Sequence, residues 1–205
     1  KLGWANLSAW AKIGKCFLRA FFRRQYSDGP HTLDDELITS VHWWIRALQD
    51  WPSSAIPWTP AVSGPPFHLY VDASTLDQSR GAVLVTPDKT YWTTKRENST
   101  SHINIVELKA ATLALATFQS MLQNRTFVLW TDSKSVHGWL INKRGHTSTP
   151  QCRDLLIAFW LRCLHIKAWP WIMHVSSTCN VADWASRQDH FLRLASFHFV
   201  EPVEL

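Results

Sequence analysis

The sequence predicts an α/β fold in which a mixed β-sheet is flanked by helices. Three short runs of strand-forming residues follow one another with only short turns between them. Two further strand-like runs come later, each after a segment with helical periodicity. The order βββαβααβα is typical of a sheet with three antiparallel strands followed by parallel additions.

The expected strands and helices are bounded by turn residues. The first three strands form a meander with turns at "DQS" and "PDK". The fifth contains Pro170, which offers no N–H to a sheet ladder, so we expect it at an edge. We expect strands at residues 67–73, 80–86, 89–94, 126–131 and 167–175. We expect helices at residues 103–121, 133–142, 151–165 and 181–189, the last capped by Asn180.

The first third of the chain has a different pattern. Residues 4–25 carry apolar side chains at helical spacing with a basic opposite face, and a second helical segment follows. Residues 50–66 are rich in Pro and Ser and read as a linker. The expected organisation is a helical connection segment with its linker over 1–66, the α/β domain over 67–190 and a C-terminal tail over 191–205.

The composition is that of a chain with a packed core. Of the 205 residues, 46% are hydrophobic and 18% are charged, a balance that excludes intrinsic disorder. No apolar run approaches the roughly 18 residues that span a bilayer, so no membrane partner is expected. The four cysteines form no C-x-x-C pair and suit a reducing intracellular compartment. The net charge of +5 favours an anionic partner, above all a nucleic acid.

Four acidic residues stand where a charge needs a partner. Asp72 ends the first expected strand and Asp132 ends the fourth, and a βββαβ order most easily makes these strands neighbours. Glu107 lies on the helix face that should meet the sheet, and Asp183 lies in the first turn of the last helix. A charge at the end of a core strand is costly unless it is paired, solvated or bound to a metal.

Clustered carboxylates repel one another, and a hard divalent cation relieves that repulsion. Mg²⁺ prefers oxygen ligands and keeps several waters. Two such ions about 4 Å apart can activate a water and stabilise the leaving oxygen of a phosphodiester. The four acids therefore predict a site for two Mg²⁺ ions, with Mn²⁺ as an alternative, and nuclease or phosphoryl-transfer chemistry.

Each acid taken alone has a simpler interpretation. An Asp at a strand end can form a turn, and an Asp before a helix can cap it. A helical Glu can extend to the surface, and an Asp in a first turn can interact with the helix dipole. The combination of all four, in this order and on these elements, favours the metal site.

Four segments carry a resemblance to a known family. They are, in chain order, "YVDAS", "INIVELKAA", "LWTDSKSV" and "HVSSTCNVADWASR". Together they resemble the ribonuclease H domain of retroelement reverse transcriptases, most closely in the DIRS-like and BEL/Pao-like groups. The resemblance covers residues 67–190, and residues 31–50 are similar to the connecting segment before that domain. Ser176 departs from the pattern, because the family has Pro after its histidine, and no polymerase Y-x-D-D run occurs.

The resemblance implies a ribonuclease H-like fold and hydrolysis of the RNA strand of RNA·DNA hybrids. It implies that Asp72, Glu107, Asp132 and Asp183 are catalytic metal ligands. His174 would correspond to the family's histidine, which assists product release or water positioning, although a His in an aromatic strand can also be structural. A reverse transcriptase polymerase domain or a larger complex would be the protein partner.

Recognition of a hybrid requires contacts to the 2′-hydroxyls of one strand and the phosphates of the other. Polar and basic side chains near the expected site are candidates for these contacts, although each can also be an ordinary solvated residue. The candidates are Ser74, Asn104, Ser133, Lys134, Lys143, Arg144 and Arg187.

Two other functions are compatible with the same fold. A domesticated, catalytically silent copy could have a structural or nucleic-acid-binding role in a larger assembly, and the 13 tryptophans suit a chain buried among partners. The presence of all four acids argues against the hypothesis of a silent copy, because copies that are no longer under selection for catalysis lose such residues easily. An integrase or transposase fits less well, since Glu107 lies between the two aspartates and not in a late helix.

Overall fold

A computed structural model of the protein describes residues 14–15, 17–26, 33–49, 64–96, 101–142 and 150–203. The chain divides into two compact units, residues 1–58 and 59–205. Within the described residues, no helix has both the length and the apolar character needed to cross a membrane.

The first unit contains two described helices, α2 (Arg19–Gln25) and α3 (Asp35–Gln49). The rings of Phe17 and Trp43 stack with their centroids 4.2 Å apart. Arg23 Nη1 lies 2.9 Å from Glu36 Oε2, which adds an ion pair between the two helices. Much of the expected helix over residues 4–25 lies outside the described residues.

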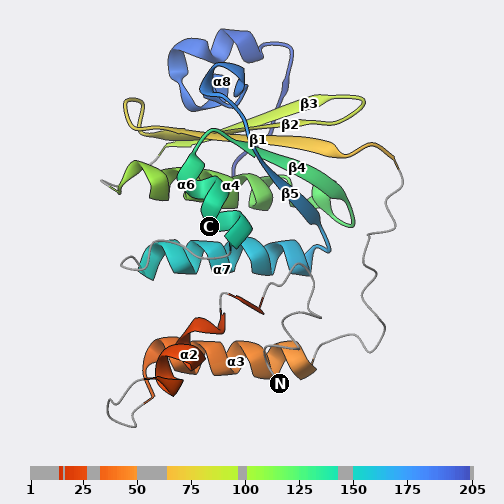
Figure 1. Ribbon diagram of the computed structural model, residues 1–205. Coiled ribbons are helices and arrows are strands. Elements are labelled where there is room, and N and C mark those ends of the chain that lie inside the picture. Colours follow the sequence, from red (N-terminus) through yellow and green to blue (C-terminus); the bar gives the residue numbers. More distant parts are fainter. Residues whose placement is uncertain are drawn as a thin grey trace. The chain divides into compact units, whose positions relative to one another are not determined.

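The second unit is built on a six-stranded sheet with the order β5-β4-β1-β2-β3-β6 (Figure 1). The strands are β1 (Phe67–Ser74), β2 (Ser79–Val85), β3 (Thr90–Arg96), β4 (Thr126–Thr131), β5 (Trp169–His174) and β6 (His198–Phe199). The first three pair antiparallel, and β4 and β5 add in parallel beside β1. The predicted α/β fold with its mixed sheet is confirmed, and β5 with Pro170 lies at an edge as expected.

The sixth strand is a difference from the expected five-stranded sheet. β6 has only two residues and pairs in parallel with β3, and it lies in the segment 191–205 that was expected to be a tail. Leu194 in the same segment is buried. A strand this short carries too little alternation to be recognised in a sequence.

The helices of this unit lie on both faces of the sheet. They are α4 (Ile103–Thr117), α5 (Gln119–Leu122), α6 (Lys134–Asn142), α7 (Pro150–His165) and α8 (Asp183–Ser186), with 3₁₀ turns η2 (Ser177–Cys179) and η3 (Gln188–Leu194). Figure 1 shows α4 between the sheet and α7, and α8 above the opposite face. The expected last helix over 181–189 is interrupted because Arg187 is extended, with φ −122° and ψ 125°.

α8 approaches the sheet closely at one point. A Cβ added to Gly81 of β2 would lie 2.4 Å from both the backbone C of Ala185 and the backbone N of Ser186. Beside this contact, the Ser79 hydroxyl donates a hydrogen bond to the carbonyl oxygen of Ser186. Gly81 pairs with Asp72 in the neighbouring strand, so the close approach lies next to one of the four acids.

We predict that Gly81→Ala lowers the melting temperature. The added methyl group must displace the backbone of α8, and overpacking of this kind typically costs about 1–3 kcal/mol. Gly138→Ala in α6 is the matched control, because a Cβ there meets nothing within 4 Å. Removing a glycine from a helix interior stabilises it by about 1 kcal/mol, so this melting temperature should rise. Thermal unfolding followed by circular dichroism measures both, and equal shifts would contradict the close approach.

Candidate metal centre

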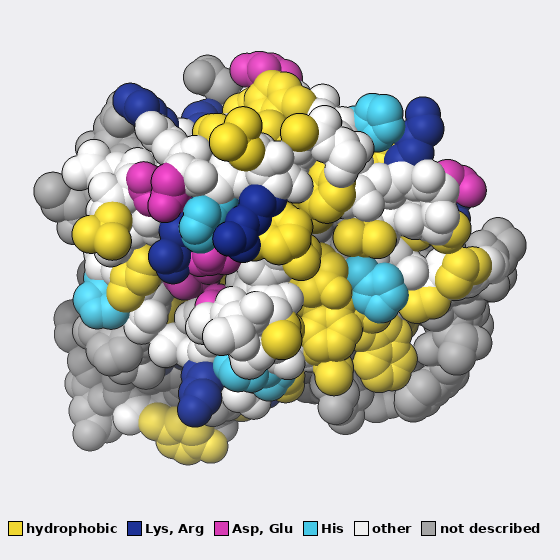
Figure 2. All heavy atoms as spheres, turned by 90° about the horizontal axis from the view of Figure 1, so that it is seen from above, with side chains coloured by type: hydrophobic (Ala, Val, Ile, Leu, Met, Phe, Trp, Pro, Cys, Tyr) yellow, Lys and Arg dark blue, Asp and Glu magenta, His cyan; other side chains and the backbone are white. Residues whose placement is uncertain are grey.

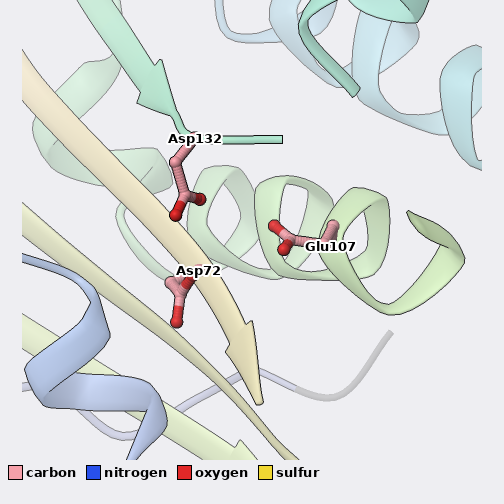
Figure 3. A group of neighbouring side chains, drawn as sticks. All are labelled: Asp72, Glu107 and Asp132. Atoms are coloured by element: carbon pink, nitrogen blue, oxygen red, sulfur yellow. The ribbon is translucent and has the colours of Figure 1, made fainter. Parts of the chain in front are cut away.

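Three of the four acids meet beside the central strands of the sheet. Figure 3 shows Asp72 on β1 and Asp132 just after β4, with Glu107 reaching them from α4. One carboxylate oxygen from each lies within 4.8 Å of the others. Tyr70 and Trp130 are partners in the parallel β1–β4 register, so the two aspartates, each two residues further along, occupy equivalent positions.

Glu107 is the most constrained of the three. Its side chain is buried, and Oε2 has no hydrogen-bond partner among the described residues. Burial, reinforced by the charges of Asp72 and Asp132, raises the pKa of Glu107 to about 9. Without a cation this carboxyl therefore holds a proton at neutral pH. A buried polar atom without a partner is costly, and a cation bound between the three carboxylates would satisfy it.

Asp72 is also buried but has a hydrogen-bond partner. Burial raises the pKa of Asp72 to about 6, although the hydrogen bond that the Ser186 hydroxyl donates to Oδ2 opposes this shift. The charges of Asp132 and Asp183 raise the pKa of Asp72 further, and Arg187 lowers it. Ser186 therefore favours the ionised form that a metal ligand needs.

Asp132 is held by Asn180. Asn180 Nδ2 donates hydrogen bonds to Asp132 Oδ1 at 3.2 Å and to the carbonyl oxygen of Val71 at 3.0 Å. Its Oδ1 accepts a hydrogen bond from the backbone N–H of Ala182 at 3.3 Å. The amide is buried and connects β1, the end of β4 and the start of α8.

The sequence interpretation assigned Asn180 only a capping role and did not include Ser186 among the site residues. The structure places both in contact with the acid cluster. Both stand in the segment "NVADWASR", which carried part of the family resemblance. That motif was the signal that could have identified them.

Asp183 does not lie in the group of three. Its Oδ1 is 2.7 Å from Arg187 Nη2, and its Oδ2 is 3.5 Å from His190 Nδ1. Its charge still reaches Asp72, because it contributes to the raised pKa of that carboxyl. The fourth expected ligand is thus beside the cluster and paired with Arg187, which was itself expected to contact phosphate.

His174 lies at the end of β5 and is exposed. Its Nε2 is 3.1 Å from the carbonyl oxygen of Asp132. Its ring lies 6.0 Å, centroid to centroid, from that of His137 in α6. The histidine expected near the site therefore stands directly beside one of the three clustered acids.

The expected nucleic-acid contacts have different surroundings. The Ser74 hydroxyl donates to Asp77 Oδ2 at 3.0 Å, and the Ser133 hydroxyl accepts from the backbone N–H of Val136 at 3.4 Å, so both stabilise local turns. Asn104 Nδ2 donates to Ser135 Oγ at 3.3 Å, and Lys134 is exposed at the start of α6. The remaining two candidates, Lys143 and Arg144, lie outside the described residues.

The strand order and the antiparallel and parallel pairings define a ribonuclease H-like fold. RNase H1 of the halophilic archaeon Halobacterium salinarum is 21% identical over 58% of this chain and 91% of that chain, with a TM-score of 0.47. The N-terminal RNase H domain of a Mycobacterium tuberculosis protein, solved as a fusion with maltose-binding protein, is 15% identical over 58% and 92%, with a TM-score of 0.46. LC11-RNase H1 in complex with an RNA/DNA hybrid is 14% identical over 57% and 91%, with a TM-score of 0.47. No family model and no curated protein matches the chain.

The acid cluster predicts how stability depends on pH. The folded chain raises the pKa of Glu107 from 4.5 to about 9, so it binds this proton more tightly than the unfolded chain does. Without divalent cations, stability should therefore fall as the pH rises through this range. The pKa of Asp72 is raised from 3.8 to about 6, so this residue also makes stability fall with rising pH, over a lower pH range. Glu107→Gln, which is neutral at every pH, should flatten the fall in melting temperature measured in EDTA.

Added Mg²⁺ supplies the complementary measurement. A cation must displace the Glu107 proton, so stabilisation by Mg²⁺ should be greater at mildly alkaline than at mildly acidic pH. Glu201→Gln, which changes an exposed carboxylate, should keep the parent's pH slope and Mg²⁺ response. An unchanged slope in Glu107→Gln would show that Glu107 does not bind its proton as the geometry requires.

Proposed function

We propose that this protein is a metal-dependent endonuclease that hydrolyses the RNA strand of RNA·DNA hybrids. The acid cluster carries the proposal, because three carboxylates come within 4.8 Å of one another and two of them are buried. Repulsion within such a group is costly, and the unpartnered Glu107 Oε2 adds to that cost. A stable fold that keeps this arrangement is best explained by a cation that the three acids bind.

The donor set fits a hard divalent cation, since every ligand atom is a carboxylate oxygen. Asp72, Glu107 and Asp132 would hold Mg²⁺ or Mn²⁺, and we propose two ions with Asp183 as a further ligand. When bound, such ions make a water nucleophilic near neutral pH and stabilise charge on the leaving oxygen of a phosphodiester. Asp183 would have to exchange its ion pair with Arg187 for this role.

The chain's own residues hold the carboxylates in place. Asn180 fixes one oxygen of Asp132 against β1, and Ser186 fixes one oxygen of Asp72. His174 is exposed and lies beside the Asp132 backbone. We propose for it the role of positioning water or assisting product release.

Hybrid recognition would use the polar side chains around the cluster. Asn104 lies in the first turn of α4, Ser133 directly precedes α6, and Ser74 supports the β1–β2 turn; these side chains would contact 2′-hydroxyls. Lys134, Arg187, Lys143 and Arg144 would contact phosphates. The net charge of +5 supports binding to a polyanion.

The proposed setting is a retroelement reverse transcriptase, which the order of the four motifs in the sequence supports. In that setting a polymerase domain is the partner of this chain. Sequencing the transcript upstream of the codon for Lys1 tests the setting. A polymerase coding region in the same reading frame is the expected result, and an unrelated domain there would contradict it.

We predict that Asp132→Asn abolishes hybrid cleavage while the fold is retained. The change removes a ligand charge but nearly keeps the side-chain shape, and it relieves repulsion in the cluster. Changes to groups that merely support metal ligands cost 10–100-fold, so loss of a ligand should exceed about 100-fold. The assay follows a labelled RNA·DNA hybrid with Mg²⁺, Mn²⁺ or EDTA, with duplex DNA and single-stranded RNA as substrates that should resist cleavage.

Asp88→Asn is the matched control for this assay, because it makes the same change at an exposed turn between β2 and β3. It should cleave like the parent, and both variants should keep the parent's circular dichroism spectrum. If the parent binds no Mg²⁺ and cuts no hybrid, the chain is instead a catalytically silent subunit of a larger assembly.

A further inference from the structure

Alternating residues place aromatic side chains on one face of the sheet. Leu69 and Leu129 are fully buried, and successive side chains of a strand point to opposite faces. Tyr70 and Trp130 therefore point to the other face, where Tyr70 packs against a cluster that includes Ala185 of α8. The aromatic side chains thus share the sheet face that carries α8.

The rings on this face are ordered by contacts with one another. The rings of Tyr70 and Trp130 have centroids 5.9 Å apart and planes within 13°. The rings of His68 and Trp130 lie 6.1 Å apart with planes within 20°. The indole N–H of Trp130 donates a hydrogen bond to His68 Nδ1 at 3.0 Å. The one polar atom of the Trp130 side chain therefore has a partner, and the rest of the side chain is apolar ring.

The same face continues onto the edge strand β5 and is open there. Met173 pairs with Trp130, and Trp171 pairs with Val128, in the parallel β4–β5 register. Trp171 is 62% exposed and Met173 is 44% exposed, whereas α8 packs over β1, β2 and β3. We call His68, Tyr70, Trp130, Trp171 and Met173 the aromatic platform. Figure 2, which views this face, shows hydrophobic side chains gathered beside basic and acidic ones.

We propose that the aromatic platform binds unpaired nucleotides that flank the hybrid in the active site. The inference rests on the proposed nuclease function and specifies its substrate as a hybrid with a single-stranded extension. Tyr70 and Trp130 each precede a cluster aspartate by two residues, which is about 7 Å along a strand. Successive bases are spaced by about 3.4 Å, so a strand leaving the site would reach the rings within a few nucleotides.

The chemistry of the platform favours a nucleic acid over a protein partner. Bases of every sequence present a flat π-face that stacks on Trp, Tyr or His, and an exposed sheet face with aromatic side chains is suited to this contact. Basic groups stand on the adjoining elements. Arg193 lies over the Trp184 ring at 5.6 Å, and Arg187 is about half exposed beside Asp183. Basic side chains thus lie on the elements next to the platform, where they can meet the phosphates of a bound strand.

The test compares three substrates: a blunt hybrid, the same hybrid with a single-stranded DNA extension at its 5′ end, and the same hybrid with the extension at its 3′ end. Each extension has about ten nucleotides, which is within the site sizes of proteins that bind single strands. The full chain is assayed for kcat/KM on each substrate and, separately, for binding to free oligodeoxythymidylate by fluorescence anisotropy. The parent should favour the extended hybrid at one end by about tenfold, as expected for stacking of one base. Trp171→Leu should lose this preference and keep the parent's rate on the blunt hybrid.

Two variants make the comparison specific. Trp171→Phe retains a ring and should keep most of the preference. Phe199→Leu removes a 49% exposed ring from the opposite edge strand β6 and should keep all of it. Trp171 is exposed on an edge strand, so its replacement should leave the melting temperature nearly unchanged.

The outcomes separate this inference from the proposed function. Equal rates on blunt and extended hybrids, or equal losses on both in Trp171→Leu, would overturn the platform. It would also be overturned if Trp171→Leu converted a dimer to a monomer in sedimentation without changing oligonucleotide affinity, because the platform would then be a contact between copies of the chain. A parent that cuts no hybrid but binds free single strands through Trp171 would overturn the nuclease and support the platform.

Discussion

The burial of Glu107 against the sheet is the constraint on which the site depends. α4 is covered by the sheet on one side and by α7 on the other, so nearly all of its residues are buried. A buried glutamate in such a helix is poorly solvated, so its charge is best neutralised by a proton or by a cation. The two aspartates beside it have the same charge and add repulsion, which raises the pKa of Glu107 further.

The segment after β5 completes this centre from the other side of the sheet. Asn180 bonds to Val71 and Asp132, while Ser186 bonds to Asp72 and accepts from Ser79. These contacts need the α8 backbone to lie directly on β2, which the absence of a side chain at Gly81 permits. The orientation of two carboxylates is therefore coupled to the docking of a helix of only four residues.

The sequence predicted the parts of the structure that depend on local pattern. The strand alternation, the Ala- and Leu-rich helix and the edge position of Pro170 follow from periodicity and backbone chemistry, and the structure agrees with them. The pairing of Asp183 with Arg187 was not foreseen, although its i, i+4 spacing permits it. The sixth strand and the half-open face depend on where residues 191–199 fold back, which is a tertiary effect without a local signal.

Pro170 has a consequence for the behaviour of the whole chain in solution. A sheet edge with exposed Trp171 and Met173 is the kind of surface on which strands of other molecules add and start aggregates. Pro170 deprives β5 of one ladder donor, and the opposite edge, β6, is only two residues long. Strand addition to β5 is therefore disfavoured at the edge that carries the open aromatic surface.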